Sequence, residues 1–394
     1  MKTLVNYACV VKLAPTIRQL DRIKQFGGNC RWLYNHLLNQ DQTQTITSVK
    51  TKCQYITKLR QEYPWLKESH VHILQTTADH LGNAWNHSIK HKFGFPKFKK
   101  KSNNSDGFEY KAGCYIDQGQ IWLPKIGLVS FHDSYRLPNQ KLGKVNIKQQ
   151  ADGWYASILF KKEINVEPNG GLPVGIDLGI TTFVTLSDGT KFNNLKIFRK
   201  YLRRLKSRQR RLSRKVKGSN NRKKYTNKLA RMHQKVARVR RDWQHKLSTH
   251  LAKNHSLICV ESLAVKNMVK NHCLAMSISD CAWSSFIAML KYKCVWYGSE
   301  LRAIDRWYPS SKTCSICHLI NHELTLADRI WTCKGCGTVH DRDVNAAKNL
   351  LDVGTGGQPG TTSLELATPV EKPRALARRS RKNSRHATLE SPRL

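Results

Sequence analysis

Three acidic residues in this sequence stand where an isolated charge is unfavourable unless it has a function. Asp177 lies in the apolar run of residues 174–178, Glu261 ends the apolar run of residues 256–261, and Asp343 stands at the start of a helical stretch. A lone carboxylate in a buried strand is energetically costly, and the usual reason to place one there is a metal ion at the edge of the strand. If the three acids converge, they form a cage for divalent cations that prefer oxygen ligands. Two such ions about 4 Å apart can activate water and stabilise the leaving oxygen in phosphodiester cleavage.

Each acid also has a simpler explanation, because a turn residue, an ion-pair partner or a helix cap would look the same in the sequence. Asp341 lies two residues before Asp343 and is the alternative third ligand. We expect Asp341 instead to cap the helix or to support the site from outside, since its side chain can accept hydrogen bonds from the first helical amides. The convergence of the three acids is therefore a hypothesis about the fold.

A second group of residues has the spacing of a metal-binding site. Cys314 and Cys317 form one Cys-x-x-Cys pair, Cys333 and Cys336 form another, and 15 residues separate the pairs. Each pair places two sulfurs on one turn, and two such turns make a closed tetrahedral site, usually for zinc. Because a closed site has no open coordination position, we expect it to be structural. Iron is an alternative metal.

The net charge of the chain limits the classes of protein to which it can belong. The 394 residues include 68 Lys and Arg against 27 Asp and Glu, a formal net charge of +41. Such an excess is typical of proteins that bind a polyanion, which leaves ribosomal proteins, nucleic-acid enzymes and membrane-surface binders. We find no run of 18 apolar residues and no signal peptide, so we expect neither a membrane-spanning nor a secreted protein. The other eight cysteines are scattered singly, which indicates a reduced cytosolic compartment.

The charge is concentrated in residues 199–246, which hold 21 Lys or Arg residues and a single acid, Asp242. Apolar residues recur every three or four positions from Tyr225 to Leu247, and a turn at Gly218 precedes them, which predicts a helical hairpin with an apolar seam. A solvated surface helix normally mixes charges of both signs, so we expect the outer faces to bind nucleic-acid backbone. The residues expected to do so are Arg203, Arg204, Arg208, Arg211, Arg214, Lys215, Arg222, Lys223, Lys224, Arg231 and Arg238.

The N-terminal part shows strand and helix signals in turn. Residues 2–13 alternate roughly as a strand, and Thr16 with Gln19 has the spacing of a capping box that starts a helix. We expect Gly27-Gly28 to interrupt that helix before a second one at residues 30–39. A long apolar stripe then predicts a helix from position 71 to 89.

Composition changes where aromatic and cationic residues mix, in the segment of residues 93–101. Together with the strand at residues 2–13, the strands that follow could complete a small β-barrel that carries the helices as an insertion. A hairpin turn at residues 151–153 joins the last two of these strands. The strands are expected at residues 108–111, 120–123, 128–131, 144–148 and 154–160.

The second half should form a sheet around Asp177. Three strands joined by tight turns predict an antiparallel meander with Asp177 on the first, and two later apolar runs add strands. From residue 352 the chain is rich in Gly, Pro, Ser and Thr, so we expect disorder towards the C-terminus. The strands are expected at residues 174–178, 182–186, near 191–192, 256–261 and 300–304.

The order of these motifs resembles the TnpB (OrfB) family, the RNA-guided endonucleases of bacterial and archaeal insertion sequences, long described as transposases and related to compact type V CRISPR effectors. The resemblance covers about residues 1–350 and is most specific in the second half. His318 departs from the family, which commonly has Gly after the second Cys, and it could distort that turn or be tolerated. The matching segments are Gly175–Gly179, Arg241–Ser248, Val260–Met268, Pro309–Cys317, Trp331–Gly337 and His340–Ala347, with Pro15-Thr16 and Phe95–Phe98 in the first half.

The resemblance implies an α/β RNase H-like (RuvC) nuclease domain with the basic hairpin and a zinc ribbon inserted, plus an N-terminal wedge β-barrel that carries a helical recognition domain. The implied domains are the wedge barrel at residues 1–14 and 93–168, the recognition domain at 15–92, the nuclease at 172–305 with the hairpin at 199–246, the zinc ribbon at 306–339, the nuclease C-terminal helix at 340–352 and a disordered tail at 353–394.

The resemblance also assigns roles and partners. Asp177, Glu261 and Asp343 match the three catalytic acids, which would hold two Mg²⁺ ions, and the four cysteines would hold a structural Zn²⁺. A guide RNA from the end of the element would select a double-stranded DNA target by base pairing, while the protein reads a short flanking motif. We expect a monomer, with no membrane partner, in the cytoplasm of a bacterium or archaeon and associated with the nucleoid.

Two other functions stay open at this point. An RNase H-like site with three acids could also join DNA strands, which would make the protein a transposase or a transposition accessory protein. A non-cleaving regulator that binds RNA and DNA is the other alternative, and the three intact acids argue against it.

Overall fold

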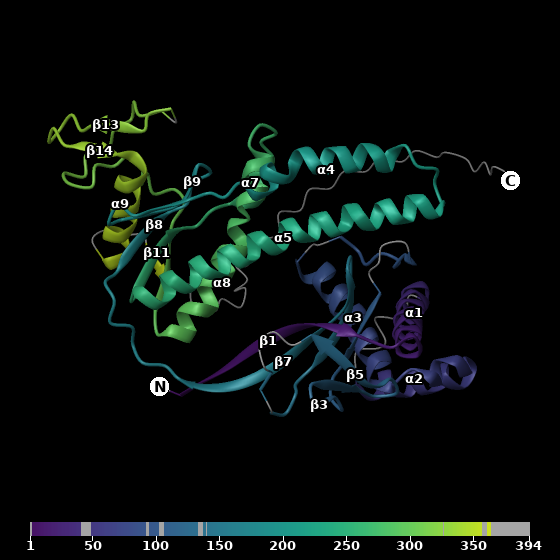
Figure 1. Cartoon of the computed structure of the whole chain (residues 1–394). Coiled ribbons are helices and arrows are strands. Elements are labelled where there is room, and N and C mark those ends of the chain that lie inside the picture. Colours follow the sequence, from purple (N-terminus) through teal and green to yellow (C-terminus); the bar gives the residue numbers. More distant parts are fainter. Residues whose placement is uncertain are drawn as a thin grey trace, which may run out of the picture.

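The chain folds around two sheets joined by the linker that follows residue 165 (Figure 1). In the computed structural model, no helix within the described ranges is both long and apolar enough to cross a bilayer. The structure describes residues 2–40, 49–91, 94–101, 106–132, 137–138, 140–325, 327–356 and 361–363.

The first half consists of α-helices α1 (Ile17–Asn39), α2 (Val49–Glu62) and α3 (Val71–His91), the 3-10 helix η2 (Pro64–Glu68) and strands β1 (Lys2–Ala14), β2 (Gly107–Tyr110), β3 (Tyr115–Asp117), β4 (Gln120–Leu123), β5 (Gly127–His132), β6 (Val145–Gln150) and β7 (Gly153–Asn165). The second half consists of β8 (Val174–Asp177), β9 (Thr182–Leu186), β10 (Lys191–Asn193), α4 (Ile197–Ser213), α5 (Asn220–Asn254), β11 (Leu257–Glu261), α6 (Val265–Met268), α7 (Ala275–Cys281), α8 (Trp283–Tyr297), β12 (Glu300–Ile304), β13 (Ile330–Thr332), β14 (Val339–Asp341), α9 (Arg342–Thr355) and β15 (Thr361–Ser363).

The first sheet has seven strands in the order β2-β6-β7-β1-β5-β4-β3, all paired antiparallel. The first strand of the chain lies at its centre, paired with β7 from Lys2↔Asn165 to Lys12↔Tyr155. The prediction that this strand completes the sheet of later strands is therefore confirmed, whereas β3 was not predicted. Among the described residues no pairing joins the edge strands β2 and β3, so closure into a barrel stays an expectation.

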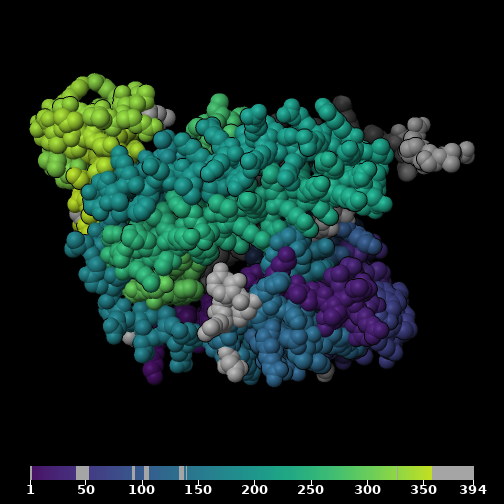
Figure 2. All heavy atoms as spheres, viewed as in Figure 1, coloured from purple at the N-terminus to yellow at the C-terminus, as the bar shows by residue number. Residues whose placement is uncertain are grey.

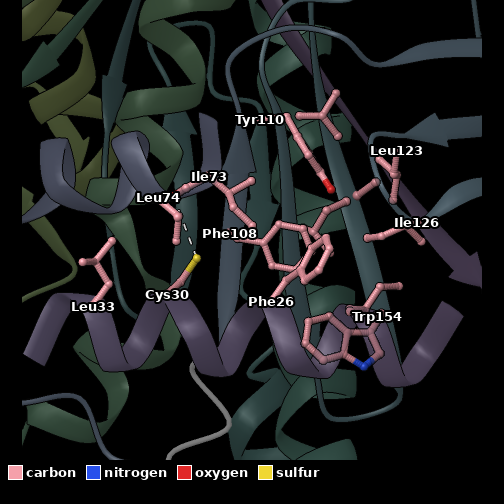
Figure 3. Packing of buried hydrophobic residues seen from close by; sticks show 14 of the residues in the cluster. Phe26, Cys30, Leu33, Ile73, Leu74, Phe108, Tyr110, Leu123, Ile126 and Trp154 are labelled. Carbon is pink, nitrogen blue, oxygen red and sulfur yellow. Dashed lines mark hydrogen bonds between the residues drawn. The ribbon is translucent and has the colours of Figure 1, made fainter. Parts of the chain in front are cut away.

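Helices α1 and α3 pack against this sheet and form its core (Figure 3). The capping box of Thr16 and Gln19 is present, as predicted. The prediction that Gly27-Gly28 divide this segment was wrong, because α1 runs through both glycines. A glycine costs about 1 kcal/mol in a helix, which the buried apolar face outweighs, and Gly27 lets the helix approach the chain at Asp106, only 3.0 Å from where a Cβ would lie.

The second sheet has the order β10-β9-β8-β11-β12-β15. Strands β8, β11 and β12 are parallel. Strand β9 pairs antiparallel with β8, and β10 pairs antiparallel with β9, which confirms the predicted meander. Side chains alternate between the two faces of a strand, and Val174, Ile176 and Val260 pack in one core with residues of α5 and α8. Helix α9 covers the opposite face.

Helix α9 extends beyond the predicted boundary at residue 352. It runs to Thr355 because Val353 is buried against Leu350 and Ile304. Strand β15 then pairs with β12. The tail predicted to start at residue 353 is thus helical in its first three residues, and most of the remaining tail lies outside the described residues.

Candidate active site and metal centre

Asp177 and Glu261 stand at corresponding ends of two neighbouring parallel strands. Strands β8 and β11 pair in register up to Ile176↔Val260, and each acid is the next residue along its strand. Paired strands lie about 4.8 Å apart, so the two acids start side by side at the carboxyl edge of the sheet. The sequence marks both acids at the ends of apolar runs, but it makes the pairing of the two strands only a hypothesis.

Both acids face the side of the sheet that α9 covers. Gly175 shares its face of β8 with Asp177 by alternation, and a Cβ at Gly175 would lie 1.8 Å from the carbonyl oxygen of Ala347. On β11, Cys259 shares a face with Glu261, and a Cβ built at Gly354 of α9 would lie 2.0 Å from its sulfur. The helix thus lies directly on the strands that carry the acids.

The N-terminus of α9 brings the third acid to this edge. Asp341 caps the helix and accepts hydrogen bonds from the amides of Asp343 and Val344, at 3.1 Å each. Lys191 of β10 lies 2.6 Å from the carboxylate of Asp341. Burial alone would raise the pKa of Asp341, but the bond from Lys191 and the amides bring it below the ordinary value. The expected capping role of Asp341 is therefore confirmed.

The surroundings of Asp177 raise its pKa. Burial is the largest cause, the negative charges of Asp343 and Glu261 act in the same direction, and together they bring the pKa from 3.8 to about 7. Burial also raises the pKa of Glu261. Arg329 lies 3.6 Å from the Asp343 carboxylate. The three acids are not among the described groups whose ligand atoms all lie within 4.8 Å of one another. Such a set of oxygens fits hard divalent cations.

The four predicted cysteine ligands form one cluster. The sulfurs of Cys314, Cys317, Cys333 and Cys336 all lie within 4.8 Å of one another. Two pairs of sulfurs are 3.5 and 3.6 Å apart, close to the separation of about 3.8 Å that tetrahedral bonds of 2.3 Å to zinc require. Thr338, whose Oγ1 is 3.2 Å from the sulfur, lowers the pKa of Cys336 to about 6, whereas hydrogen bonds with the other cysteines raise the pKa of Cys317. The donor set fits zinc.

The two Cys-x-x-Cys turns have the same backbone geometry. The amide of His318 donates to the Cys314 carbonyl at 3.0 Å, and that of Gly337 donates to the Cys333 carbonyl at 2.9 Å. His318 and Gly337 both have positive φ, 59° and 71°. A left-handed residue is needed at this position, which explains why glycine suits it. His318 does not distort its turn.

The basic hairpin forms as predicted, with α4 and α5 packed along an apolar seam that includes Leu205 and Val236. It extends from the sheet of β8 and β11 over the first half of the chain (Figures 1 and 2). Of the eleven side chains predicted to bind nucleic acid, eight are exposed: Arg203, Arg204, Arg211, Arg214, Lys223, Lys224, Arg231 and Arg238. The half-buried ones are Arg208, Lys215 and Arg222. Five of the eleven contact the protein itself: Arg208, Lys215, Arg222, Arg231 and Arg238.

Arg238 joins the hairpin to the first sheet. It contacts Asp152, in the β6–β7 turn, at 3.1 Å, and its guanidinium bonds to the hydroxyl of Tyr155. Gln234 donates to the same carboxylate at 2.7 Å. Beside this contact lies a cleft of ≈ 630 Å³ between the sheet and α5, whose lining includes Lys148 and Arg241. The cleft is large and cationic enough to hold backbone phosphates.

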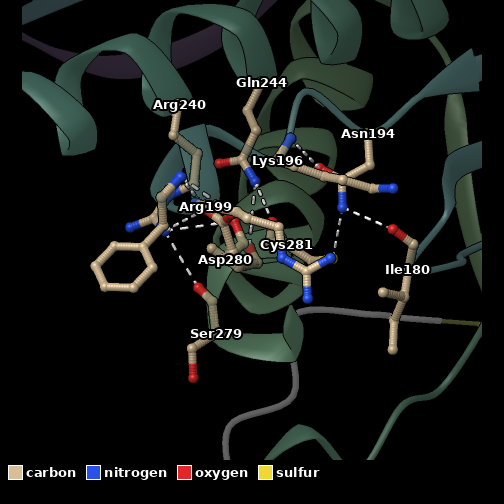
Figure 4. A network of polar contacts seen from close by, with 11 residues as sticks. Ile180, Asn194, Lys196, Arg199, Arg240, Gln244, Ser279, Asp280 and Cys281 are labelled. Atoms are coloured by element: carbon tan, nitrogen blue, oxygen red, sulfur yellow. Dashed lines mark hydrogen bonds and ion pairs between the residues drawn. The ribbon is translucent and has the colours of Figure 1, made fainter. Parts of the chain in front are cut away.

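Asp280 was not singled out from the sequence, yet it holds the hairpin at its base (Figure 4). Helix α4 begins at Ile197, and its N-cap residue Lys196 makes no side-chain capping hydrogen bond. The Asp280 carboxylate, from α7, accepts hydrogen bonds from the amides of Phe198 and Arg199, at 3.0 and 3.4 Å. It also lies 3.7 Å from Arg240 of α5. A cap supplied from about 80 residues away leaves no local sequence signal.

Three family models match the chain. The model described as "Probable transposase" matches residues 157–272, "Cas12f1-like, TNB domain" matches residues 283–350, and "Helix-turn-helix domain" matches residues 1–45. The first contains Asp177 and Glu261, and the second contains Asp343 and the four cysteines.

The chain is also similar to whole proteins. A Streptomyces pristinaespiralis protein named "Putative RNA-guided DNA endonuclease" is 37% identical over 366 residues, 90% of each chain. The Escherichia coli protein named "Putative RNA-guided DNA endonuclease InsQ" is 32% identical and covers 87% of this chain and 91% of its own. Among solved structures, the fold resembles Cas12f1 in its complex with sgRNA and target DNA, with a TM-score of 0.55 and 15% identity over 85% of this chain and 82% of that one. Two relatives that are more than 30% identical cover most of the chain, and the matching family model is that of the OrfB transposases of IS605-type elements. This chain therefore belongs to the TnpB (OrfB) family.

Proposed function

We propose that the protein is an RNA-guided DNA endonuclease of an insertion sequence, and that it cleaves DNA phosphodiesters at Asp177, Glu261 and Asp343. The observation that carries the proposal is the pairing of β8 with β11, which sets Asp177 and Glu261 side by side at one edge of the sheet, beneath the helix whose first turn carries Asp343. Relatives named as RNA-guided endonucleases support the guided activity.

The proposed mechanism uses divalent cations bound by the three acids. Two Mg²⁺ ions would supply activation of the attacking water and charge stabilisation of the leaving oxygen. Asp177 and Glu261 are positioned for binding by the edge of the sheet, and Asp343 by the first turn of α9. Asp341 is occupied by Lys191 and the helix amides, so it holds Asp343 in place instead of binding an ion.

The other parts of the proposal follow from the family. The second sheet with α5, α8 and α9 is proposed as the RNase H-like RuvC domain, residues 306–339 as a zinc ribbon, and the first sheet as the wedge barrel with α1–α3 as the recognition domain. Exposed cations of the hairpin and the cleft beside Arg238 would contact the backbones of a guide RNA and of the DNA target. We propose that the protein acts as a monomer in the cytoplasm, associated with the nucleoid.

The experiment is to express the chain with its native flanking DNA, purify it and sequence the bound RNA. A discrete RNA whose 3′ end reads out of the element would support guidance, and matched DNA with Mg²⁺ then tests cleavage. The Asp177→Ala variant should retain RNA and lose cleavage. Full cleavage by that variant would contradict the site.

A transposase is the second candidate, because the matching family model carries that description. It predicts strand-transfer products without any RNA. A non-cleaving regulator predicts tight RNA and DNA binding with no cut in Mg²⁺, and the same assays separate both from the endonuclease.

A further inference from the structure

Two asparagines of α9 are buried between the acids and the four-cysteine cluster. Asn345 and Asn349 are 1% and 0% exposed, and they stand one helical turn apart on one face. Neither takes part in the proposed cleavage chemistry or in metal binding. Buried amide side chains are usually hydrogen-bonded, and the partners of these two lie in a single segment, although the Asn349 Oδ1 atom has none within the described part of the chain.

That segment is the approach to the first cysteine turn. Asn345 donates to the Thr313 carbonyl at 2.7 Å and accepts from the Ser315 amide at 2.9 Å. Asn349 donates to the same Thr313 carbonyl at 2.6 Å and to the Ser310 carbonyl at 2.7 Å. Residues 313 and 315 flank Cys314, so the asparagines bind the backbone on both sides of a proposed zinc ligand.

A second connection reaches the start of the same helix. The Nε2 atom of His340 lies 3.1 Å from the sulfur of Cys314, and its ring packs on Trp331 with centroids 4.9 Å apart. His340 immediately precedes Asp341, the cap that binds the Asp343 amide. The segment around Cys314 therefore contacts the chain both before Asp343, at His340 of β14, and after it, at Asn345 and Asn349 of α9.

The opposite side of the helix is fixed by the sheet. Ala346 and Ala347 are fully buried, and Gly175 receives the helix backbone directly. The first turn of α9 thus has two supports, the strands that carry Asp177 and Glu261 on one side and the cysteine segment on the other. Loss of the second support would leave Asp343 on a helix end held from one side.

We propose that Asn345 and Asn349 are positioning residues that couple the folded four-cysteine cluster to Asp343, so that the acid site is complete only when the cluster is formed. The role of Asp343 in this inference rests on the proposed function. The mechanical coupling itself does not, and the experiment separates the two.

The test is amide hydrogen exchange on the zinc-loaded full chain, with zinc content measured in parallel. In Asn345→Ala and Asn349→Ala, exchange over residues 342–347 should rise at least tenfold while one zinc per chain remains, because the ligands are untouched. Thr355→Ala is the matched control, since its hydroxyl bonds only to carbonyls of its own helix; exchange over residues 342–347 should not change. Asn349→Ser replaces Asn349→Ala if that variant does not fold.

Chelation of zinc gives the decisive comparison. Chelation should raise exchange over residues 342–347 in the wild type. The rise should be smaller in Asn345→Ala, because that variant has already lost one of the contacts between the cysteine segment and α9. Unchanged exchange in both asparagine variants, or equal effects of chelation with and without Asn345, would overturn the proposal.

Cleavage provides the functional readout. With guide and target bound, Asn345→Ala should cut at least tenfold more slowly at saturating DNA, bind target within twofold of the wild type and need more Mg²⁺ for half-maximal rate. A purely structural loss would weaken DNA binding and leave the Mg²⁺ dependence unchanged, which would also overturn it. If the wild type does not cleave at all, the proposed function fails, and hydrogen exchange still decides the coupling.

Discussion

The absent side chain of Gly175 makes room for the backbone of Ala347, whose carbonyl oxygen would lie 1.8 Å from a Cβ at that position. Glycine at this point of β8 is therefore a packing requirement between the strand that carries Asp177 and the helix that carries Asp343. The neighbouring atoms are backbone, which cannot rotate away.

Gly175→Ala should accordingly separate α9 from the sheet. We expect the free energy of unfolding to fall by about 3 kcal/mol or more, because overpacking against a fixed backbone is poorly relieved. DNA cleavage should be lost as well. Thermal unfolding and cleavage assays measure both. Gly170→Ala, at a linker glycine with no atom within 4 Å of the added Cβ, is the control and should change neither. An active, stable Gly175→Ala protein would contradict the packing argument.

Asp177→Asn should stabilise the metal-free protein above pH 7. The folded-state pKa of about 7 lies above the ordinary 3.8, so the folded protein binds the extra proton and its stability falls as pH rises from about 4 through 7. The neutral amide of Asn avoids this loss, which is at most about 4 kcal/mol for a pKa raised from 3.8 to about 7.

Thermal melts of wild type and Asp177→Asn at pH 5 and pH 8, with EDTA, measure the difference. The gap in melting temperature should widen at pH 8, and Mg²⁺ should narrow it by stabilising only the wild type. Asp188→Asn alters an exposed turn acid and should show no such pH dependence. A gap that is the same at both pH values would show that folding does not raise the pKa of Asp177.

Periodic patterns along the chain were enough to predict many of the helices and strands of the fold. Thr16 with Gln19 marked a helix start, and the apolar seam from Tyr225 to Leu247 marked α5, because these signals depend on neighbours within one or two turns. The Gly27-Gly28 prediction failed because local propensity is weaker than burial of a helix face against a sheet formed much later in the chain.

The site was predictable where a residue type was out of place in its pattern. A lone acid at the end of an apolar strand drew attention to Asp177 and Glu261, and Cys spacing marked the cluster. Asp152 and Asp280 carry no such signal, since their partners Arg238 and Arg240 are distant in sequence. Exposure on the hairpin also could not be predicted, so Arg222, whose guanidinium binds two backbone carbonyls, was grouped with the exposed cations.

Asp280→Ala should fray the base of the hairpin. It removes the acceptor for two α4 amides and the partner of Arg240, and loss of a helix cap costs about 1–2 kcal/mol. We expect faster hydrogen exchange over residues 197–201 and weaker binding of nucleic acid. Asp280→Asn keeps an acceptor oxygen and should recover most of the protection.

The matched control for this change is Asp242→Ala, which removes the exposed ion pair with Lys246 on the same hairpin. Such a pair contributes only about 0.3–0.5 kcal/mol, so exchange in α4 should not change. If Asp280→Ala and Asp242→Ala raise hydrogen exchange in α4 equally, the rise comes from the removed negative charge and the capping interpretation is wrong.

His318→Gly should tighten the four-cysteine cluster. A non-glycine residue at φ 59° costs roughly 1 kcal/mol relative to glycine, so relief of this strain should slow zinc transfer to a chelator about fivefold. Gly337→Ala tests the same requirement in reverse at φ 71°, where nothing lies within 4 Å of the new Cβ, and it should speed zinc release by a similar factor. Because the two positions have equivalent backbone bonds, opposite shifts would establish that the left-handed residue after each cysteine pair controls the stability of the cluster. Equal release rates in all three proteins would show that this strain does not contribute to metal retention.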